Sequence, residues 1–156
     1  MVAQQSRRTF CRNAGQVASL AVLGASVGSI FEGCSLPTSP GSAPTLQVVS
    51  APVTDGSVVV PIDASSPLST VGNAVAVQSA LGLFLVARTG QNAFIALSAI
   101  CTHQTCTITE FGGQTYVCPC HGSQFSTSGH VLSGPAPASL RQFTTRFDGT
   151  VLTIAA

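Results

Sequence analysis

The sequences CTHQTC at residues 101–106 and CPCHGS at residues 118–123 decide how this chain is interpreted. Each segment places a thiol and an imidazole a few residues apart, and each carries a second thiol beside them. Thiolate sulfur and imidazole nitrogen are side-chain donors that bind zinc and iron in proteins. Two loops with this content predict a metal or cluster site. The candidate ligands are Cys101, His103, Cys118 and His121.

The second thiol of each loop, Cys106 or Cys120, helps to separate two interpretations of the site. Cysteine and histidine at short spacings are common in structural zinc sites, so a zinc-stabilised binding module is one alternative. Zinc would take four ligands and leave these two thiols unexplained. An iron-sulfur site accounts for all six side chains, and neutral imidazole ligands would make its reduced state less unfavourable than in an all-thiolate cluster. We therefore favour the cluster.

The two loops resemble those of the Rieske iron-sulfur family, which read C-T-H-x-G-C and C-P-C-H-G-S. The resemblance extends specifically over residues 99–137, where Gly134-Pro135-Ala136-Pro137 is similar to the proline-rich loop that lies beside the cluster in that family. It implies a [2Fe-2S] cluster in which two Cys bind one iron and two His bind the other. It also implies that Gly134, Pro135 and Pro137 shield the cluster.

The resemblance assigns roles to three further positions. Cys106 and Cys120 would form a disulfide across the loops, a bond that persists best in an oxidising compartment such as the periplasm. Ser123 matches a serine whose hydroxyl donates to a bridging sulfide. Phe125 stands where high-potential members have a tyrosine that donates to a ligand sulfur. With one of two donors missing, we expect a potential in the middle of the Rieske range of about −150 to +300 mV.

The function that the resemblance implies is single-electron transfer. The leading hypothesis is transfer from a quinol-oxidising, cytochrome b-type subunit to a c-type cytochrome, with His121 at the exposed tip. Members that contact quinol commonly carry Leu and Gly where this chain has Gln104 and Thr105. A small Rieske subunit of a periplasmic oxidase, of the arsenite oxidase type, and a freestanding carrier are therefore kept as alternatives. No cluster role is expected for His130, which has no Cys or His at ligand spacing.

The N-terminal segment resembles an export signal. Residues 6–12, SRRTFCR, are similar to a twin-arginine motif, and an apolar stretch follows at residues 14–31. This stretch is at the short end of what spans a bilayer, since about 20 residues are usually needed. Cys34 is either a lipidation site or an incidental thiol. Both interpretations predict a protein on the outer face of the cytoplasmic membrane, in the periplasm, after export by the twin-arginine route.

Composition limits the partners and the number of domains. The chain has 156 residues, and from residue 35 onward it carries three arginines, no lysine and four acidic residues, a net charge of −1 with neutral His. Such a surface cannot hold a nucleic-acid backbone, so no nucleic-acid partner is expected. We expect a signal, anchor or lipoprotein segment at residues 1–34, a flexible linker at 35–52 and one Rieske domain at 53–156.

The domain is expected to be all-β, an antiparallel sandwich that carries both loops and follows an apolar N-terminal helix. Short runs rich in Val, Ile, Phe and Thr alternate with Gly, Pro, Ser and Asn, and no helical period persists. Gly112-Gly113 and Asp148-Gly149 predict hairpin turns. The predicted strands are 46–49, 57–62, 74–78, 83–87, 93–99, 107–111, 114–117, 131–132, 140–147 and 150–154.

Overall fold

The structure is a computed structural model that describes residues 43–156. In this part of the chain the only helix is a short 3-10 turn, η1 (Pro67–Ser69), and the all-β prediction is confirmed. The predicted apolar helix, the twin-arginine motif and Cys34 lie outside the described residues. The strands are β1 (Val48–Ser50), β2 (Val53–Thr54), β3 (Ser57–Pro61), β4 (Ala74–Ser79), β5 (Gly82–Gly90), β6 (Ala93–Ser98), β7 (Glu110–Gly112), β8 (Thr115–Val117), β9 (Gln124–Ser126), β10 (Val131–Ser133), β11 (Gln142–Phe147) and β12 (Val151–Ala155).

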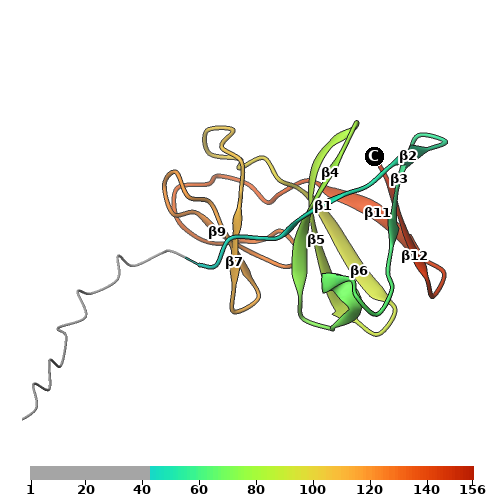
Figure 1. The fold of residues 1–156 in the computed structure, drawn as a ribbon. Coiled ribbons are helices and arrows are strands. Elements are labelled where there is room, and N and C mark those ends of the chain that lie inside the picture. Colours follow the sequence, from blue (N-terminus) through green and yellow to red (C-terminus); the bar gives the residue numbers. More distant parts are fainter. Residues whose placement is uncertain (1–42) are drawn as a thin grey trace, which may run out of the picture. The chain divides into compact units, whose positions relative to one another are not determined.

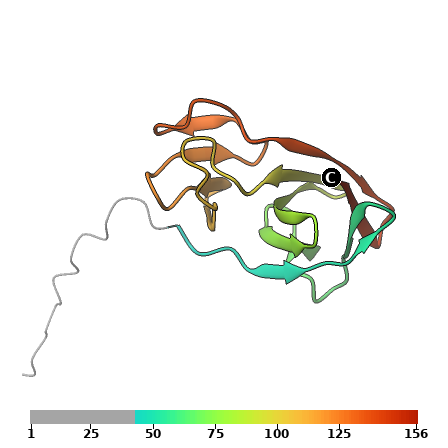
Figure 2. The ribbon, with the colours of Figure 1, turned by 90° about the horizontal axis from the view of Figure 1, so that it is seen from above.

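The strands form two sheets. An eight-stranded sheet has the order β1-β4-β5-β6-β11-β12-β3-β2, and a four-stranded sheet has the order β10-β9-β8-β7. The small sheet stands beside the large one, as β7 and β9 show in Figure 1, while the large sheet is strongly curled in the view from above (Figure 2). No helix within residues 43–156 has the length and apolar character needed to cross a membrane.

Strand alternation in the large sheet builds two separate cores. Successive side chains of a strand point to opposite faces, so Phe84 and Val86 of β5 enter one core while Leu85 and Ala87 enter the other. The first core lies inside the curled sheet and also contains Leu152. The second core joins the large sheet to the small one. Besides Leu85 and Ala87 it contains Leu97, Ala99, Cys101, Ile108, Tyr116, Cys118, Phe125, Ala136 and Leu140.

The segment that enters the domain connects both sheets. The amide of Phe111 in β7 donates to the carbonyl of Pro44, and the amide of Leu46 donates to the carbonyl of Thr109. A few residues later, β1 pairs with β4 of the large sheet in parallel. Part of the segment expected to be a flexible linker, residues 44–50, therefore belongs to the folded domain.

Two strands and one pairing differ from the sequence prediction. The short strands β2 and β9 were not predicted, and β1 lies parallel to its neighbour although an antiparallel sandwich was expected. The first hairpin turns at Gly113-Gln114, because Gly112 pairs with Thr115. At the last hairpin, Asp148 Oδ1 accepts the amides of Thr150 and Val151 at 2.9 and 2.8 Å, and these bonds lower the pKa of Asp148.

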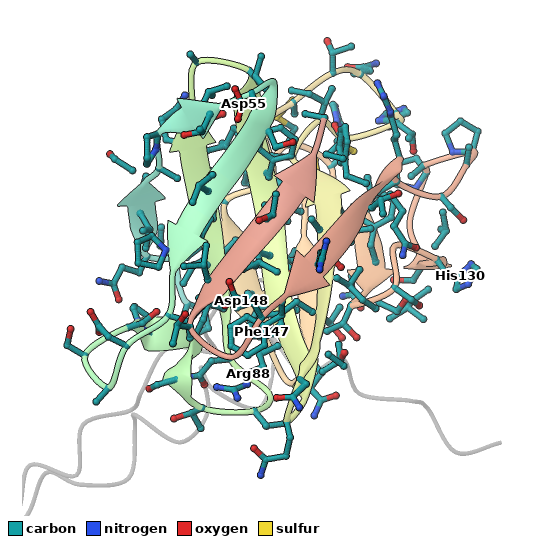
Figure 3. All side chains as sticks on the ribbon, turned by 90° about the vertical axis from the view of Figure 1, so that its right-hand side faces the viewer. Asp55, Arg88, His130, Phe147 and Asp148 are labelled. Carbon is teal, nitrogen blue, oxygen red and sulfur yellow. A yellow bond between two sulfur atoms is a disulfide. The ribbon has the colours of Figure 1, made fainter. Side chains whose placement is uncertain are left out.

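Arg88 ties together one end of the large sheet. Its Nη1 donates to the carbonyls of Leu68 and Ser69 at 3.0 and 2.8 Å, its Nε donates to Gly90, and its Nη2 donates to Gln91. The guanidinium also lies over the rings of Phe94 and Phe147, 5.3 and 6.0 Å from their centroids. Figure 3 shows Arg88 beside Phe147 and Asp148 at this end of the domain. One half-buried side chain thus satisfies four backbone carbonyls, two in η1 and two at the end of β5 and just after it.

We expect Arg88→Met to lower the free energy of unfolding by about 2 to 3 kcal/mol, because hydrogen bonds to a charged group contribute roughly 1.5 to 3 kcal/mol and the freed carbonyls can be partly rehydrated. Chemical denaturation followed by circular dichroism would measure this. Arg146→Met is the matched control, since Arg146 is exposed, and it should change the stability by less than about 0.5 kcal/mol. Equal effects of the two substitutions would contradict this role of Arg88.

Candidate functional site

The two Cys-His loops have the same backbone hydrogen bonds. In the first, the amide of Cys101 donates to the carbonyl of Cys106 at 2.8 Å and its carbonyl accepts the amide of Thr105 at 3.1 Å. In the second, Cys118 makes the same two bonds with Ser123 and Gly122, at 2.8 and 3.0 Å. Each loop thus starts at a cysteine and closes back on it four and five residues later. The similar spacing of the two Cys-His motifs in the sequence thus corresponds to one type of turn that occurs twice.

Both turns need a left-handed residue at the fifth position. Gly122 has a φ of 71°, which glycine adopts without steric cost. The equivalent residue of the first loop, Thr105, has a φ of 55°. A β-branched residue is strained in this region. The backbone gives a physical reason why glycine is common at this position in the related loops.

Thr105→Gly is therefore expected to stabilise the domain by about 1 kcal/mol, since the left-handed conformation costs an L-residue roughly 1 to 2 kcal/mol and glycine loses more chain entropy on folding. Thermal unfolding of the metal-loaded protein would show this as a rise of a few degrees. Thr107→Gly is the control, because Thr107 is exposed and does not have a positive φ, and it should not stabilise. A decrease in stability for Thr105→Gly would contradict the strain.

The two thiols that start the loops are buried together. Cys101 and Cys118 are free cysteines, each 1% exposed, and both belong to the core between the sheets. Burial and then the neighbouring thiol of Cys101 raise the pKa of Cys118. Two adjacent thiolates are unfavourable in such a place unless a positive charge lies between them. This pair fits a metal centre, whose charge would hold both sulfurs as thiolates.

The two imidazoles form a second pair. The ring centroids of His103 and His121 are 4.7 Å apart, with the rings nearly perpendicular. His103 Nδ1 is buried and has no hydrogen-bond partner within the described part of the chain, which is unusual for a buried polar atom. His121 is exposed. A metal ion would give the unpartnered nitrogen of His103 the partner that the protein does not supply.

The donors are arranged in pairs and do not surround a single point. Within residues 43–156, no three His, Cys, Asp or Glu side chains are grouped closely enough to hold one metal ion. A structural zinc ion is normally bound by four ligands at one point. A thiol pair and an imidazole pair fit a two-iron cluster, in which each iron takes two protein ligands.

A disulfide joins the two loops. Cys106 and Cys120 are bonded, as the resemblance predicts. Because the bond links the end of the first loop to the middle of the second, and each pair takes one member from each loop, it restrains the separation of the two members of each pair.

The proline-rich loop is attached to both of the other loops. Thr102 Oγ1 donates to the carbonyl of Ala138 at 2.6 Å. On the other side, the amide of Ala136 donates to Ser123 Oγ at 3.1 Å. Gly134 packs so closely that a Cβ there would lie 2.6 Å from the Cα of Ser123. The predicted shielding segment, which includes Pro135 and Pro137, is thus held against the Cys-His loops.

Three aromatic residues lie in register across the small sheet. Phe125 and Tyr116 are paired in register across β9 and β8, and both are fully buried. Phe111 follows in register on β7, with its ring centroid 4.8 Å from that of Tyr116. Burial raises the pKa of Tyr116. None of the residues from 43 to 156 forms a hydrogen bond with its hydroxyl.

Three residues of this region had no role assigned from the sequence: Thr102, Ala136 and Tyr116. Thr102 lies between two candidate ligands, so its position in the sequence could have indicated a role at the site. The sequence contains no signal for the backbone amide of Ala136 or for the burial of the Tyr116 hydroxyl. His130, the third histidine, lies at the surface (Figure 3). Its Nδ1 is 3.4 Å from Ser139 Oγ.

The curated relatives that the chain resembles are iron-sulfur subunits. It is 46% identical over 57 residues to the "Cytochrome b6-f complex iron-sulfur subunit" of Prochlorococcus marinus (strain MIT 9301), which covers 36% of this chain and 32% of the relative. It is 38% identical over 64 residues to the subunit of the same name from Chlorobaculum thiosulfatiphilum, covering 40% and 35%. The chain thus matches about a third of the length of these relatives.

Solved structures support the fold, and a family model covers most of the domain. The cyanobacterial plasma membrane Rieske protein PetC3 from Synechocystis PCC 6803 superposes with a TM-score of 0.53 at 27% identity, covering 62% of this chain and 99% of that protein. Naphthalene 1,2-dioxygenase shares the fold alone, with a TM-score of 0.51 at 17% identity, covering 63% of this chain and 26% of the enzyme. The model of the Rieske [2Fe-2S] domain matches residues 58–144. The chain therefore belongs to the Rieske [2Fe-2S] domain family, and its cofactor is a [2Fe-2S] cluster.

Proposed function

We propose that this Rieske electron-transfer protein is exported and tethered to the membrane, where it passes single electrons from a quinol-oxidising, cytochrome b-type subunit to a c-type cytochrome. The observation that carries the proposal is the paired arrangement of thiols and imidazoles in two disulfide-linked loops, with His121 exposed. The relatives named as cytochrome b6-f complex subunits support the choice of partner.

In this proposal Cys101 and Cys118 hold one iron, and His103 and His121 hold the other. When bound, the cluster supplies one-electron oxidation and reduction at a potential raised by its imidazole ligands. His103 would bind through Nδ1, the nitrogen for which residues 43–156 supply no hydrogen-bond partner. Because the two thiols are buried in the core between the sheets, water is kept from the sulfur ligands. The disulfide and the proline-rich loop limit movement of the ligands during electron transfer.

His121 would be the residue that meets quinol. It is exposed, as are its neighbours Pro119 and Gly122 and, on the first loop, Gln104. Its ring nitrogen that does not bind metal would accept a hydrogen bond from a quinol hydroxyl and receive its proton. Since Gln104 is polar where quinol-contacting relatives commonly have Leu, this chain would dock through hydrogen bonds as well as apolar contact.

The surface around the site suits an uncharged docking partner. Between residues 89 and 140 the only Asp, Glu, Lys or Arg is Glu110. Electrostatic steering needs clustered charge on the approaching surfaces. Docking would therefore depend little on salt, as suits a carrier that is held near its partner by a tether.

We assign the tether to the N-terminal segment. Residues 1–34 would direct export by the twin-arginine route and remain in the membrane as an anchor or through lipid on Cys34. The linker would then begin at 35 and the domain would extend to 156.

Arg7→Lys combined with Arg8→Lys is expected to retain the protein in the cytoplasm. Labelling with a fatty-acid analogue, compared between the parent and Cys34→Ser, would distinguish lipid from an anchor helix.

The proposed function can be tested in host membranes. In a strain that lacks the chromosomal gene, quinol-driven reduction of a c-type cytochrome should be restored by the parent chain and by His130→Ala, and should stay at least tenfold lower with His121→Ala at equal protein levels. Full activity of His121→Ala would contradict the assigned role. An unchanged rate after deletion of the gene would instead favour the alternative, a periplasmic oxidase subunit.

Ser123→Ala is expected to lower the reduction potential by about 60 mV or more. Ser123 is 0% exposed, and its Oγ accepts the amide of Ala136, so its proton is free to donate to a bridging sulfide. A hydrogen bond to the more negative, reduced cluster is worth roughly 1.5 to 3 kcal/mol, and about 59 mV corresponds to about 1.4 kcal/mol for one electron. Equilibrium redox titration at one pH would measure the shift. Ser126→Ala, on β9, is the control and should leave the potential unchanged.

A further inference from the structure

Tyr116 is a buried polar residue whose hydroxyl no interaction within residues 43–156 explains. It is 0% exposed, and its hydroxyl has no hydrogen-bond partner among the described residues, sulfur atoms included. Buried tyrosine hydroxyls usually find a partner, because an unpaired buried donor costs free energy. Phenylalanine would fill the same space without this cost. The hydroxyl therefore needs an acceptor that residues 43–156 do not provide.

The position of Tyr116 indicates where this acceptor lies. Tyr116 precedes Cys118 by two residues at the end of an extended strand, so both side chains point to the same face of the small sheet. Both belong to the core that also contains Cys101. Among the described residues, two other buried side-chain nitrogen or oxygen atoms have no partner: His103 Nδ1, which the proposed cluster would satisfy, and Glu110 Oε2.

The pairing of β8 with β9 also supports a role for the Tyr116 hydroxyl. Phe125 stands where high-potential relatives carry a tyrosine that donates to a ligand sulfur, and it lies directly opposite Tyr116 on the adjacent strand. The chain thus lacks the hydroxyl on β9 and has one on β8. Glu110 pairs with Val117, the residue after Tyr116, and its side chain therefore lies on the other face of the small sheet. It is not a partner for the Tyr116 hydroxyl.

We propose that the Tyr116 hydroxyl donates a hydrogen bond to an inorganic sulfide of the bound cluster and raises its reduction potential, which compensates for the hydroxyl that Phe125 lacks. Tyr116 is thus a residue that tunes the cofactor and not a ligand. The proposal rests on the four proposed ligands, because only they place the cluster above this face of the small sheet.

The test is a redox titration of the full-length, cluster-loaded protein. Tyr116→Phe should make reduction about tenfold less favourable, a shift of about 59 mV to lower potential for one electron. Phe111→Leu is the control, because it alters the packing beside Tyr116 without removing a hydroxyl, and it should shift the potential far less. Iron and sulfide are measured in each sample, so absence of the cluster from the parent would count against the proposed ligands and not against Tyr116.

A second measurement avoids the substitution altogether. Tyr116 is the only tyrosine in the chain, so 3-fluorotyrosine supplied during expression labels this site alone. Fluorination makes the phenol a stronger donor with little change in shape, and the potential should rise. If Tyr116→Phe does not retain the cluster, the potential of the 3-fluorotyrosine protein tests the proposal instead. A parent-like potential with 3-fluorotyrosine, or with a loaded Tyr116→Phe protein, would overturn the proposal.

Discussion

Replacing Cys101 and Cys118 together by serine is expected to abolish iron binding, with less than about a tenth of the parent's iron remaining. Both thiols are buried in one core and unpaired, and serine oxygen is a poor replacement for thiolate as an iron ligand. Metal analysis and visible absorbance of the purified variant would measure the loss. Circular dichroism should still show a β-sheet protein, since the sheets do not depend on these side chains for their pairing.

The matched control is the double variant Cys106→Ser with Cys120→Ser. It removes the same number of thiols from the same loops, but these two form the disulfide. It should still bind iron, while its stability falls by about 3 kcal/mol, as expected for a closed loop of about 15 residues. Iron retained without Cys101 and Cys118, or lost equally in both double variants, would contradict the division into ligand and disulfide cysteines.

Gly134→Ala is expected to displace the proline-rich loop from the site. The added Cβ would lie 2.6 Å from Ser123 Cα, and the φ of 94° is itself unfavourable for alanine. Gly72→Ala is a close control, because Gly72 has a φ of 93° and nothing within 4 Å of its Cβ position. The steric clash should add about 2 kcal/mol to the backbone strain that both variants share.

This difference can be read from the temperature at which visible absorbance is lost. A loss of about 2 kcal/mol corresponds to roughly 10 °C in a domain of this size, so Gly134→Ala should release its cluster about 10 °C below Gly72→Ala. Equal release temperatures would show that contact between Gly134 and Ser123 does not hold the loop in place.

The sequence predicted much of this site because its signals are local. The repeated Cys-His spacing identified both loops, and the structure brings the thiols and the imidazoles together as pairs. The short strand β9 was missed because Gln124, Phe125 and Ser126 are too few to show an alternating pattern. The turn at Gly113 was placed one residue too early, because adjacent glycines do not indicate which of them pairs.

Features that depend on distant residues could not be read from the chain. The parallel pairing of β1 with β4 and the contact of Pro44 with β7 join segments far apart in the sequence. Tyr116 looked like an ordinary strand residue, and only the burial of its hydroxyl without a partner singles it out. The carbonyls that Arg88 satisfies are likewise backbone groups, which leave no mark in the residue types.

The metal content of the purified, full-length chain tests the account most directly. Protein expressed with ample iron and zinc should contain two irons and two labile sulfides per chain, as a [2Fe-2S] cluster requires. The dithionite-reduced sample should give the rhombic paramagnetic resonance signal with low average g that mixed His and Cys ligation produces. One zinc ion per chain with neither iron nor sulfide would contradict the account.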